Sequence, residues 1–134
     1  MTTLASDGGR FVASTHRDRL QRAASEAADR GVEALLITPS PDYAYLLGYG
    51  APSLERLTCL IVPADGVPAL VLPRLEESLA RHELGELADD VTLVPWDETD
   101  DPIHLVQTIV AGVRRVAVQD QMWARFALRL RAAL

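Results

Sequence analysis

The sequence predicts an α/β fold, a layered sandwich in which helices flank a central mixed β-sheet. Segments with helical and strand-like patterns alternate along the chain, as is typical of layered α/β domains. The dipeptide Asp65-Gly66 joins two apolar runs and favours a tight hairpin, so antiparallel strands are expected beside parallel ones. A chain of 134 residues that is 49% hydrophobic is long enough to form one domain with a sizeable core.

The chain begins with a polar, glycine-containing stretch, residues 1–14, which we expect to be a loose N-terminus. Residues 15–134 are predicted to form the domain. Apolar residues recur at helical spacing after the loose stretch, and Ser14 or Thr15 offers an N-cap. The pattern therefore predicts a first helix that ends at about Arg30.

A strand over residues 32–38 follows, because this short apolar run is bounded by glycine and proline. Turn-forming residues come next, and Asp42 is expected to cap one or two helical turns that end at Gly48. Residues 49–55 contain glycine and proline without any period and are predicted to form a loop.

The second half of the chain is predicted to alternate between strands and helices. Strands at 57–63 and 68–72 form the hairpin, and a helix over 74–88 leads to a strand at 91–95. Asp followed by Pro opens a helix well, so the next helix is expected to begin at Asp101 and Pro102.

A last strand at 115–119 and a C-terminal helix complete the predicted order, and the apolar spacing of that helix begins near Trp123. No apolar run reaches the ~20 residues needed to cross a bilayer. The terminus also has no signal-peptide pattern, and we expect a cytoplasmic protein without a membrane contact.

Charge and composition exclude several classes of function. The chain has 13 basic and 19 acidic residues, a net charge of −6, which argues against nucleic acid or an anionic membrane as partner. All basic residues are arginine, so a phosphate-binding P-loop lysine, a Schiff-base lysine and a Ser-Lys dyad are impossible. The single Cys59 cannot form an internal disulfide, and we expect it to be a chemically unreactive residue within a strand.

No metal or nucleophile motif is visible. His16, His82 and His104 are far apart in sequence and are expected to be polar surface residues, since zinc needs three or four ligands. The acidic residues at 97–101 lack the spacing of a calcium loop, and we expect them to cap and stabilise the following helix. No serine has a nucleophile-elbow sequence around it.

Three tyrosines crowd one segment, and they are followed by a charged pair. These residues are Tyr43, Tyr45, Tyr49, Glu55 and Arg56. In the structural interpretation, Tyr45 packs on the sheet while Tyr43 and Tyr49 half-cover its edge. In the functional interpretation, the loop tyrosines and the arginine form a rim that meets a ligand, a second domain or a second subunit.

The same region resembles a known family. Leu35-Leu-Ile37, Tyr45-Leu-Leu-Gly-Tyr49 and Arg56-Leu-Thr-Cys-Leu-Ile-Val-Pro63, with the Asp65-Gly66 turn after them, are similar to the N-terminal domain of the creatinase/prolidase group. This group includes Xaa-Pro dipeptidases and Xaa-Pro aminopeptidases. The resemblance extends from about Thr15 to the end of the chain.

This resemblance implies a ribonuclease-H-like fold and a parent hydrolase of which the chain is the first part. A C-terminal pita-bread catalytic domain would follow, with two divalent metal ions of the manganese, cobalt or zinc class. In the family these ions are held by two aspartates, a histidine and two glutamates, and none of those motifs occurs here. We therefore expect no catalytic residue, metal or cofactor in this domain, and a homodimer in the full-length enzyme. Dipeptidase, aminopeptidase and creatinase-like activities stay open.

The resemblance also suggests a role for the tyrosine-rich loop. Arg56 matches a basic position that faces substrate across the dimer in creatinase-like members, and Tyr49 lies in the same loop. Tyr43 and Glu55 join them as candidates for a substrate entrance or an interface. A surface ion pair of Arg56 with Glu55 or another carboxylate is the alternative.

Two other functions are compatible with parts of the sequence. A stand-alone protein-interaction module with a degenerate aminopeptidase-like fold would suit basic partners, given the acidic surface. A ribonuclease-H-like nuclease would need clustered carboxylates at strand ends. Asp65 is predicted to lie in a turn and Asp120 beyond the last strand, so we expect no such cluster.

Overall fold

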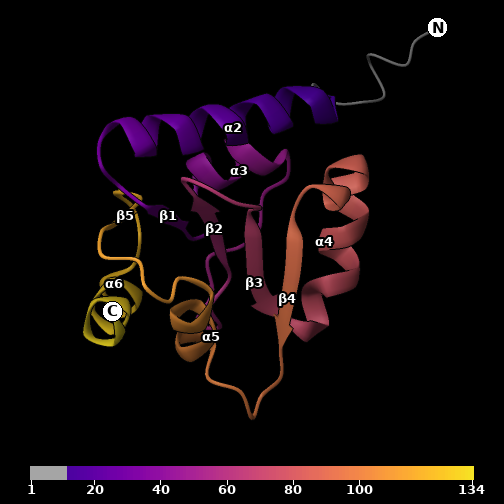
Figure 1. Ribbon diagram of the computed structural model, residues 1–134. Helices are drawn as coiled ribbons and strands as arrows, with labels where there is room; N and C mark the ends of the chain where they lie inside the picture. The colour runs from indigo at the N-terminus through magenta and orange to yellow at the C-terminus, as the bar shows by residue number, and fades with distance from the viewer. Residues whose placement is uncertain (1–11) are drawn as a thin grey trace, which may run out of the picture.

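The computed structural model describes residues 12–134, so most of the stretch predicted to be loose, residues 1–14, lies outside the described residues. Its centre is a five-stranded mixed sheet in the order β4-β3-β2-β1-β5, with helices on both faces (Figure 1). The predicted α/β sandwich and its order of elements are confirmed.

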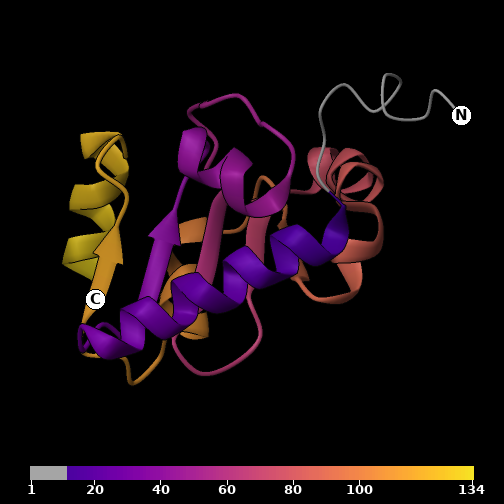
Figure 2. The same ribbon diagram turned by 90° about the horizontal axis from the view of Figure 1, so that it is seen from above.

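The first helix, α2 (Ala13–Asp29), begins slightly earlier than predicted. Val12 occupies the N-cap position without a side-chain hydrogen bond, so neither Ser14 nor Thr15 caps it. The expected hydroxyl cap was therefore wrong. The helix packs along one face of the sheet with its N-terminal half beside α3 and α4 (Figure 2).

The strand β1 (Ala34–Ile37) leads into a short helix, α3 (Pro41–Leu47). The N-cap of α3 is Ser40, whose hydroxyl accepts a hydrogen bond from the Tyr43 N–H at 3.3 Å. Asp42 lies inside the first turn, so the prediction that it caps the helix was wrong. Gly48 ends α3 at φ +82°, as predicted from the sequence.

The hairpin is confirmed, because β2 (Cys59–Pro63) and β3 (Ala69–Pro73) pair antiparallel. β4 (Thr92–Trp96) then pairs parallel with β3. The predicted helix between them is broken into a 3₁₀ turn at 74–76, α4 (Glu77–Leu84) and a second 3₁₀ stretch. Gly85 has φ +56°, which an α-helix cannot continue through.

The helix α5 (Pro102–Ile109) begins where predicted, with the Asp101 carboxylate accepting a hydrogen bond from the Ile103 N–H at 3.0 Å. β5 (Val116–Val118) pairs parallel with β1 and forms one edge of the sheet. The last helix, α6 (Ala124–Ala133), follows it.

The sheet separates two apolar interiors. One lies between the sheet and α2, α3 and α4, and the other between the sheet and α5 and α6 (Figure 1). Consecutive residues of β2 and β3 alternate between them, as with Leu60 and Ile61. Because both faces of the sheet are covered, the sequences of these strands are continuous runs of apolar residues.

Candidate functional site

The three clustered tyrosines do not lie as the sequence suggested. Tyr43 is completely buried, whereas 51% of the Tyr45 surface is exposed. The expectation that Tyr45 packs on the sheet was therefore wrong. On α3, Tyr43 shares the core-facing side with Leu46 and Leu47, three and four residues later, and Tyr45 falls on the opposite side. Tyr43 thus contributes to the core and does not reach the surface.

Tyr43 and Tyr49 form a pair at the start of the loop. Their hydroxyl oxygens are 2.7 Å apart, and the rings meet edge to face with centroids 5.6 Å apart. Burial raises the pKa of both phenols, with the carboxylate of Glu76 adding to the effect. Both rings are therefore neutral near pH 7, and the buried Tyr43 holds Tyr49 in place.

The C-terminal half of α3 is held by α2. The Arg19 guanidinium lies 3.9 Å above the Tyr45 ring and donates to the Tyr45 carbonyl at 3.0 Å. His16 Nδ1 is 3.0 Å from the same carbonyl oxygen. His16 is buried, which corrects the prediction of a surface histidine, whereas His82 and His104 are exposed as expected.

Arg56 lies at the other end of the loop and forms an ion pair with Glu98. The alternative ion pair predicted for Arg56 is thus present, with a partner 42 residues away in sequence rather than Glu55. About half of the Arg56 side chain is exposed, and Glu55 beside it is exposed. Arg56 and Glu98 border a hollow of about 230 Å³ whose wall includes Trp96 and Arg74.

The acidic stretch 97–101 connects several elements. The Asp97 carboxylate accepts a hydrogen bond from Arg74 at 2.7 Å, and Asp101 lies 3.7 Å from Arg129 of α6 while it caps α5. The Asp97 N–H donates to the Asp100 carboxylate at 2.8 Å. The predicted capping is confirmed for Asp101 alone. The arginine partners were missed because no local pattern specifies ion pairs between residues so distant in sequence.

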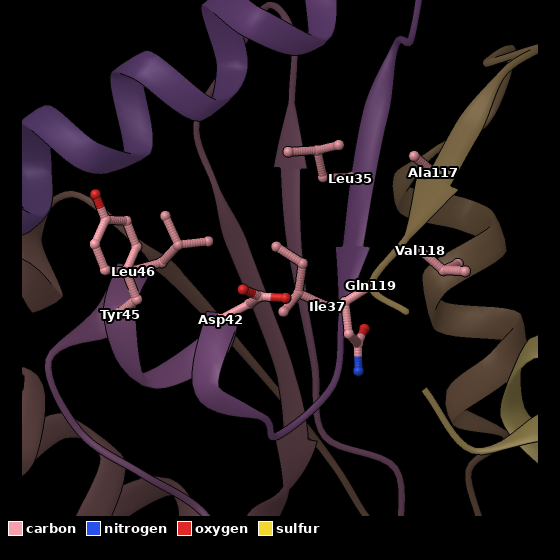
Figure 3. Close-up of a pocket in the computed structure, with 8 residues that line it drawn as sticks. All are labelled: Leu35, Ile37, Asp42, Tyr45, Leu46, Ala117, Val118 and Gln119. Atoms are coloured by element: carbon pink, nitrogen blue, oxygen red, sulfur yellow. The ribbon is translucent and has the colours of Figure 1, made fainter. Parts of the chain in front are cut away.

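A second hollow, about 260 Å³, lies between α3 and the β1–β5 edge of the sheet. Figure 3 shows its apolar lining with Asp42 and Gln119 among the side chains around it. No group of three or more histidine, cysteine or acidic side chains among residues 12–134 could hold a metal ion. Within the same residues, no helix is both long and apolar enough to cross a membrane.

A sequence model of the creatinase/prolidase N-terminal domain matches residues 19–134. The chain belongs to the creatinase/prolidase N-terminal domain family. The chain is 42% identical over 127 residues to a protein named "Probable dipeptidase PepE" from Mycobacterium tuberculosis, with 93% of this chain and 33% of that protein covered. It is also 26% identical over 105 residues to an ectoine hydrolase from Halomonas elongata, of which it covers 26%. The chain therefore spans about a third or less of the length of these relatives.

Solved structures agree with the family assignment. The crystal structure of dipeptidase PepE from Mycobacterium ulcerans superimposes with a TM-score of 0.86 at 39% identity, covering 94% of this chain and 34% of that one. The N-terminal domain of an Xaa-Pro dipeptidase from Lactobacillus brevis gives a TM-score of 0.76 at 19% identity, covering 87% of each chain. At that identity the second match shows the creatinase/prolidase N-terminal fold alone.

Proposed function

We propose that this chain is the non-catalytic N-terminal domain of a proline-specific dinuclear metallopeptidase of the Xaa-Pro dipeptidase type. The observation that carries the proposal is the 42% identity to a probable dipeptidase three times as long. In this proposal the hydrolytic site, with its two divalent metal ions, belongs to a C-terminal catalytic domain. The full-length enzyme is a cytoplasmic homodimer.

Within that enzyme, we assign Arg56 and Tyr49 to the substrate entrance of the neighbouring subunit. Arg56 supports this role because about half of its side chain is exposed and its ion-pair partner, the Glu98 side chain, is 69% exposed. An exposed ion pair contributes only about 0–1 kcal/mol, so a carboxylate of the substrate can take the place of Glu98 with little loss. A guanidinium is well suited to bind a carboxylate through two parallel hydrogen bonds.

Tyr49 supports the same role in a different way. Its hydroxyl is fixed on the buried hydroxyl of Tyr43, so the loop leaves α3 from a rigid position. Tyr43 therefore acts as the anchor of the loop rather than as part of its rim. Glu55, exposed beside Arg56, completes the surface offered to the neighbouring subunit.

The first test is catalysis by the full-length protein. We expect manganese- or cobalt-dependent cleavage of Xaa-Pro dipeptides, and its absence would contradict the proposed function and favour a protein-interaction module. Arg56→Ala should lower kcat/KM by about 10- to 100-fold, the range expected when a hydrogen bond to a charged group is lost. Arg81→Ala is the matched control, since Arg81 is exposed and paired with Glu77 on α4, and it should leave kcat/KM unchanged. Unchanged activity of Arg56→Ala would refute only the entrance role.

A further inference from the structure

Two arginines border the hollow at one end of the sheet. The strand β2 begins at this end, and the parallel strands β3 and β4 end there, with Pro73 opposite Trp96 in the last register position. Arg74 directly follows β3, and Arg56 lies shortly before β2. Both side chains line the hollow of about 230 Å³, and about half of each is exposed. The sheet thus brings two guanidinium groups from separate segments to one opening.

Each of these arginines is paired with a carboxylate, and the two carboxylates belong to consecutive residues. Arg74 Nε donates to Asp97 at 2.7 Å, and Arg56 forms its ion pair with Glu98. Asp97 and Glu98 directly follow β4, in the loop that projects beyond the end of the sheet (Figure 1). More than half of each carboxylate side chain is exposed. Exposed ion pairs stabilise a protein little, so the carboxylates of a ligand can displace both.

The two ion pairs indicate what kind of ligand could replace them. Asp97 and Glu98 present two carboxylates from consecutive residues of a peptide. A dipeptide with an acidic first residue presents the same arrangement, because its first residue carries a side-chain carboxylate and its second the C-terminal carboxylate. Guanidinium groups bind carboxylates with defined, often bidentate geometry. An acidic dipeptide therefore matches both arginines at once.

The rest of the lining suits a proline ring. It includes the apolar side chains of Pro73, Leu75 and Trp96. Trp96 is fixed there, because its indole N–H donates to the Leu57 carbonyl at 2.9 Å. An apolar cavity of about 150 Å³ is large enough for benzene, so the hollow has room for a five-membered ring. The hollow thus combines an apolar wall with two cationic groups.

We propose that this hollow gives the full-length enzyme a preference for Xaa-Pro dipeptides whose first residue is acidic. Arg56 binds the C-terminal carboxylate, and Arg74 binds the side-chain carboxylate and is a specificity-determining residue. The inference rests on the proposed function, in which Arg56 lies at the substrate entrance of the neighbouring subunit. The net charge of −6 gives the domain no general attraction for anions, so the preference would come from these two side chains.

Glu-Pro and Gln-Pro are a matched pair of substrates, since they differ in charge and hardly in shape. We expect the full-length enzyme to cleave Glu-Pro with a kcat/KM about 10-fold or more above that for Gln-Pro, the effect of one hydrogen bond to a charged group. Arg74→Gln should remove this preference. Arg81→Gln is the control and should leave the ratio unchanged, because Arg81 is exposed and paired with Glu77 on α4.

A second variant separates this role from a structural one. Asp97→Asn breaks the same ion pair as Arg74→Gln, so a purely structural contact predicts the same effect for both variants. In the proposal their effects are opposite, because Asp97→Asn frees Arg74 from a competing carboxylate. This variant should raise the ratio of kcat/KM for Glu-Pro to that for Gln-Pro. Glu77, 3.8 Å from Arg74, is present in both variants.

Binding of both dipeptides is measured by calorimetry on the same full-length samples. Equal affinity together with equal kcat/KM for Glu-Pro and Gln-Pro would overturn the inference. A preference that survives in Arg74→Gln, or shifts in the same direction in Arg74→Gln and Asp97→Asn, would also overturn it. Tighter binding of Glu-Pro that is lost in Arg74→Gln supports the inference. If neither dipeptide is cleaved while that binding difference is present, only the proposed function is contradicted.

Discussion

Replacing Gly48 by alanine tests how α2 and α3 are locked together. Gly48 ends α3 with φ +82°, and a Cβ built on it would lie 2.7 Å from Nε2 of His16. The imidazole cannot simply swing away, because His16 is buried and its Nδ1 contacts the Tyr45 carbonyl at 3.0 Å. Gly48→Ala therefore combines backbone strain with the displacement of a packed ring.

The size of the effect follows from these two parts. An alanine in the left-handed region is destabilised by about 1–2 kcal/mol, and disrupting a buried hydrogen bond adds about 1–3 kcal/mol. We expect the free energy of unfolding to fall by about 2–5 kcal/mol in total. Urea m-values of small proteins are about 1–3 kcal/mol/M, so with an m-value of about 2 kcal/mol/M the unfolding midpoint should fall by about 1–2.5 M.

Gly112 provides a matched control for the strain alone. Its φ is +85°, and no heavy atom lies within 4 Å of a Cβ built on it. Gly112→Ala should therefore lower the free energy of unfolding by only about 1–2 kcal/mol. Urea unfolding can be followed through Trp96, which is buried and donates its indole N–H to the Leu57 carbonyl at 2.9 Å.

A double-mutant cycle isolates the contact with His16. In a His16→Ala background the ring is gone, and Gly48→Ala should lose only the strain, as at Gly112. If Gly48→Ala proves no more destabilising than Gly112→Ala in the natural background, the clash between the new Cβ and His16 is relieved without a loss of stability. The reasoning that His16 locks the two helices would then be refuted.

Three further predictions concern buried polar groups. Gln119→Ala should lower the free energy of unfolding by about 2–3 kcal/mol, because a buried strand-end N–H loses its acceptor; the exposed Gln121→Ala is the control, and equal effects of both would contradict this. Burial raises the pKa of Tyr43 and Tyr49, so the folded protein keeps protons that the unfolded chain releases above about pH 10. Stability should be complete below that pH and fall by up to about 1.4 kcal/mol per pH unit for each phenol above it; a flat pH profile from 9 to 11 in urea titrations would disprove the linkage. Burial raises the pKa of the Cys59 thiol to about 12, so a thiol reagent at pH 8 should modify it only at the rate of unfolding, and rapid labelling of the folded protein would show that the thiol is accessible.

The order of helices and strands could be predicted because the turn and helix-start patterns in the sequence act locally and agree with the tertiary structure. The Asp65-Gly66 turn and the Asp101-Pro102 helix start act through neighbouring backbone groups, so their outcome depends little on the rest of the fold. The break at Gly85 was missed because an isolated glycine is tolerated inside many helices. Here the positive φ of Gly85 ends α4 at Leu84, the residue before it.

The candidate site was predicted less well. The reversed exposure of Tyr43 and Tyr45 could have been found from helical spacing, since Leu46 and Leu47 share a face with the first and not the second. The ion pair of Arg56 with Glu98 joins segments that meet only through the sheet. No pattern within either segment specifies that contact, so it became visible only in the structure.

The loop that carries the candidate residues is fastened at its two ends to different interiors. Tyr49 packs with Tyr43 among the side chains under α2 and α3. Leu57, which follows Arg56 and precedes β2, belongs to the interior under α5 and α6, and its carbonyl accepts a hydrogen bond from the Trp96 indole N–H. A closely packed interior transmits small shifts rather than absorbing them. A substitution that repacks either interior would therefore shift one end of the loop relative to the other and change the position of Arg56 at the surface.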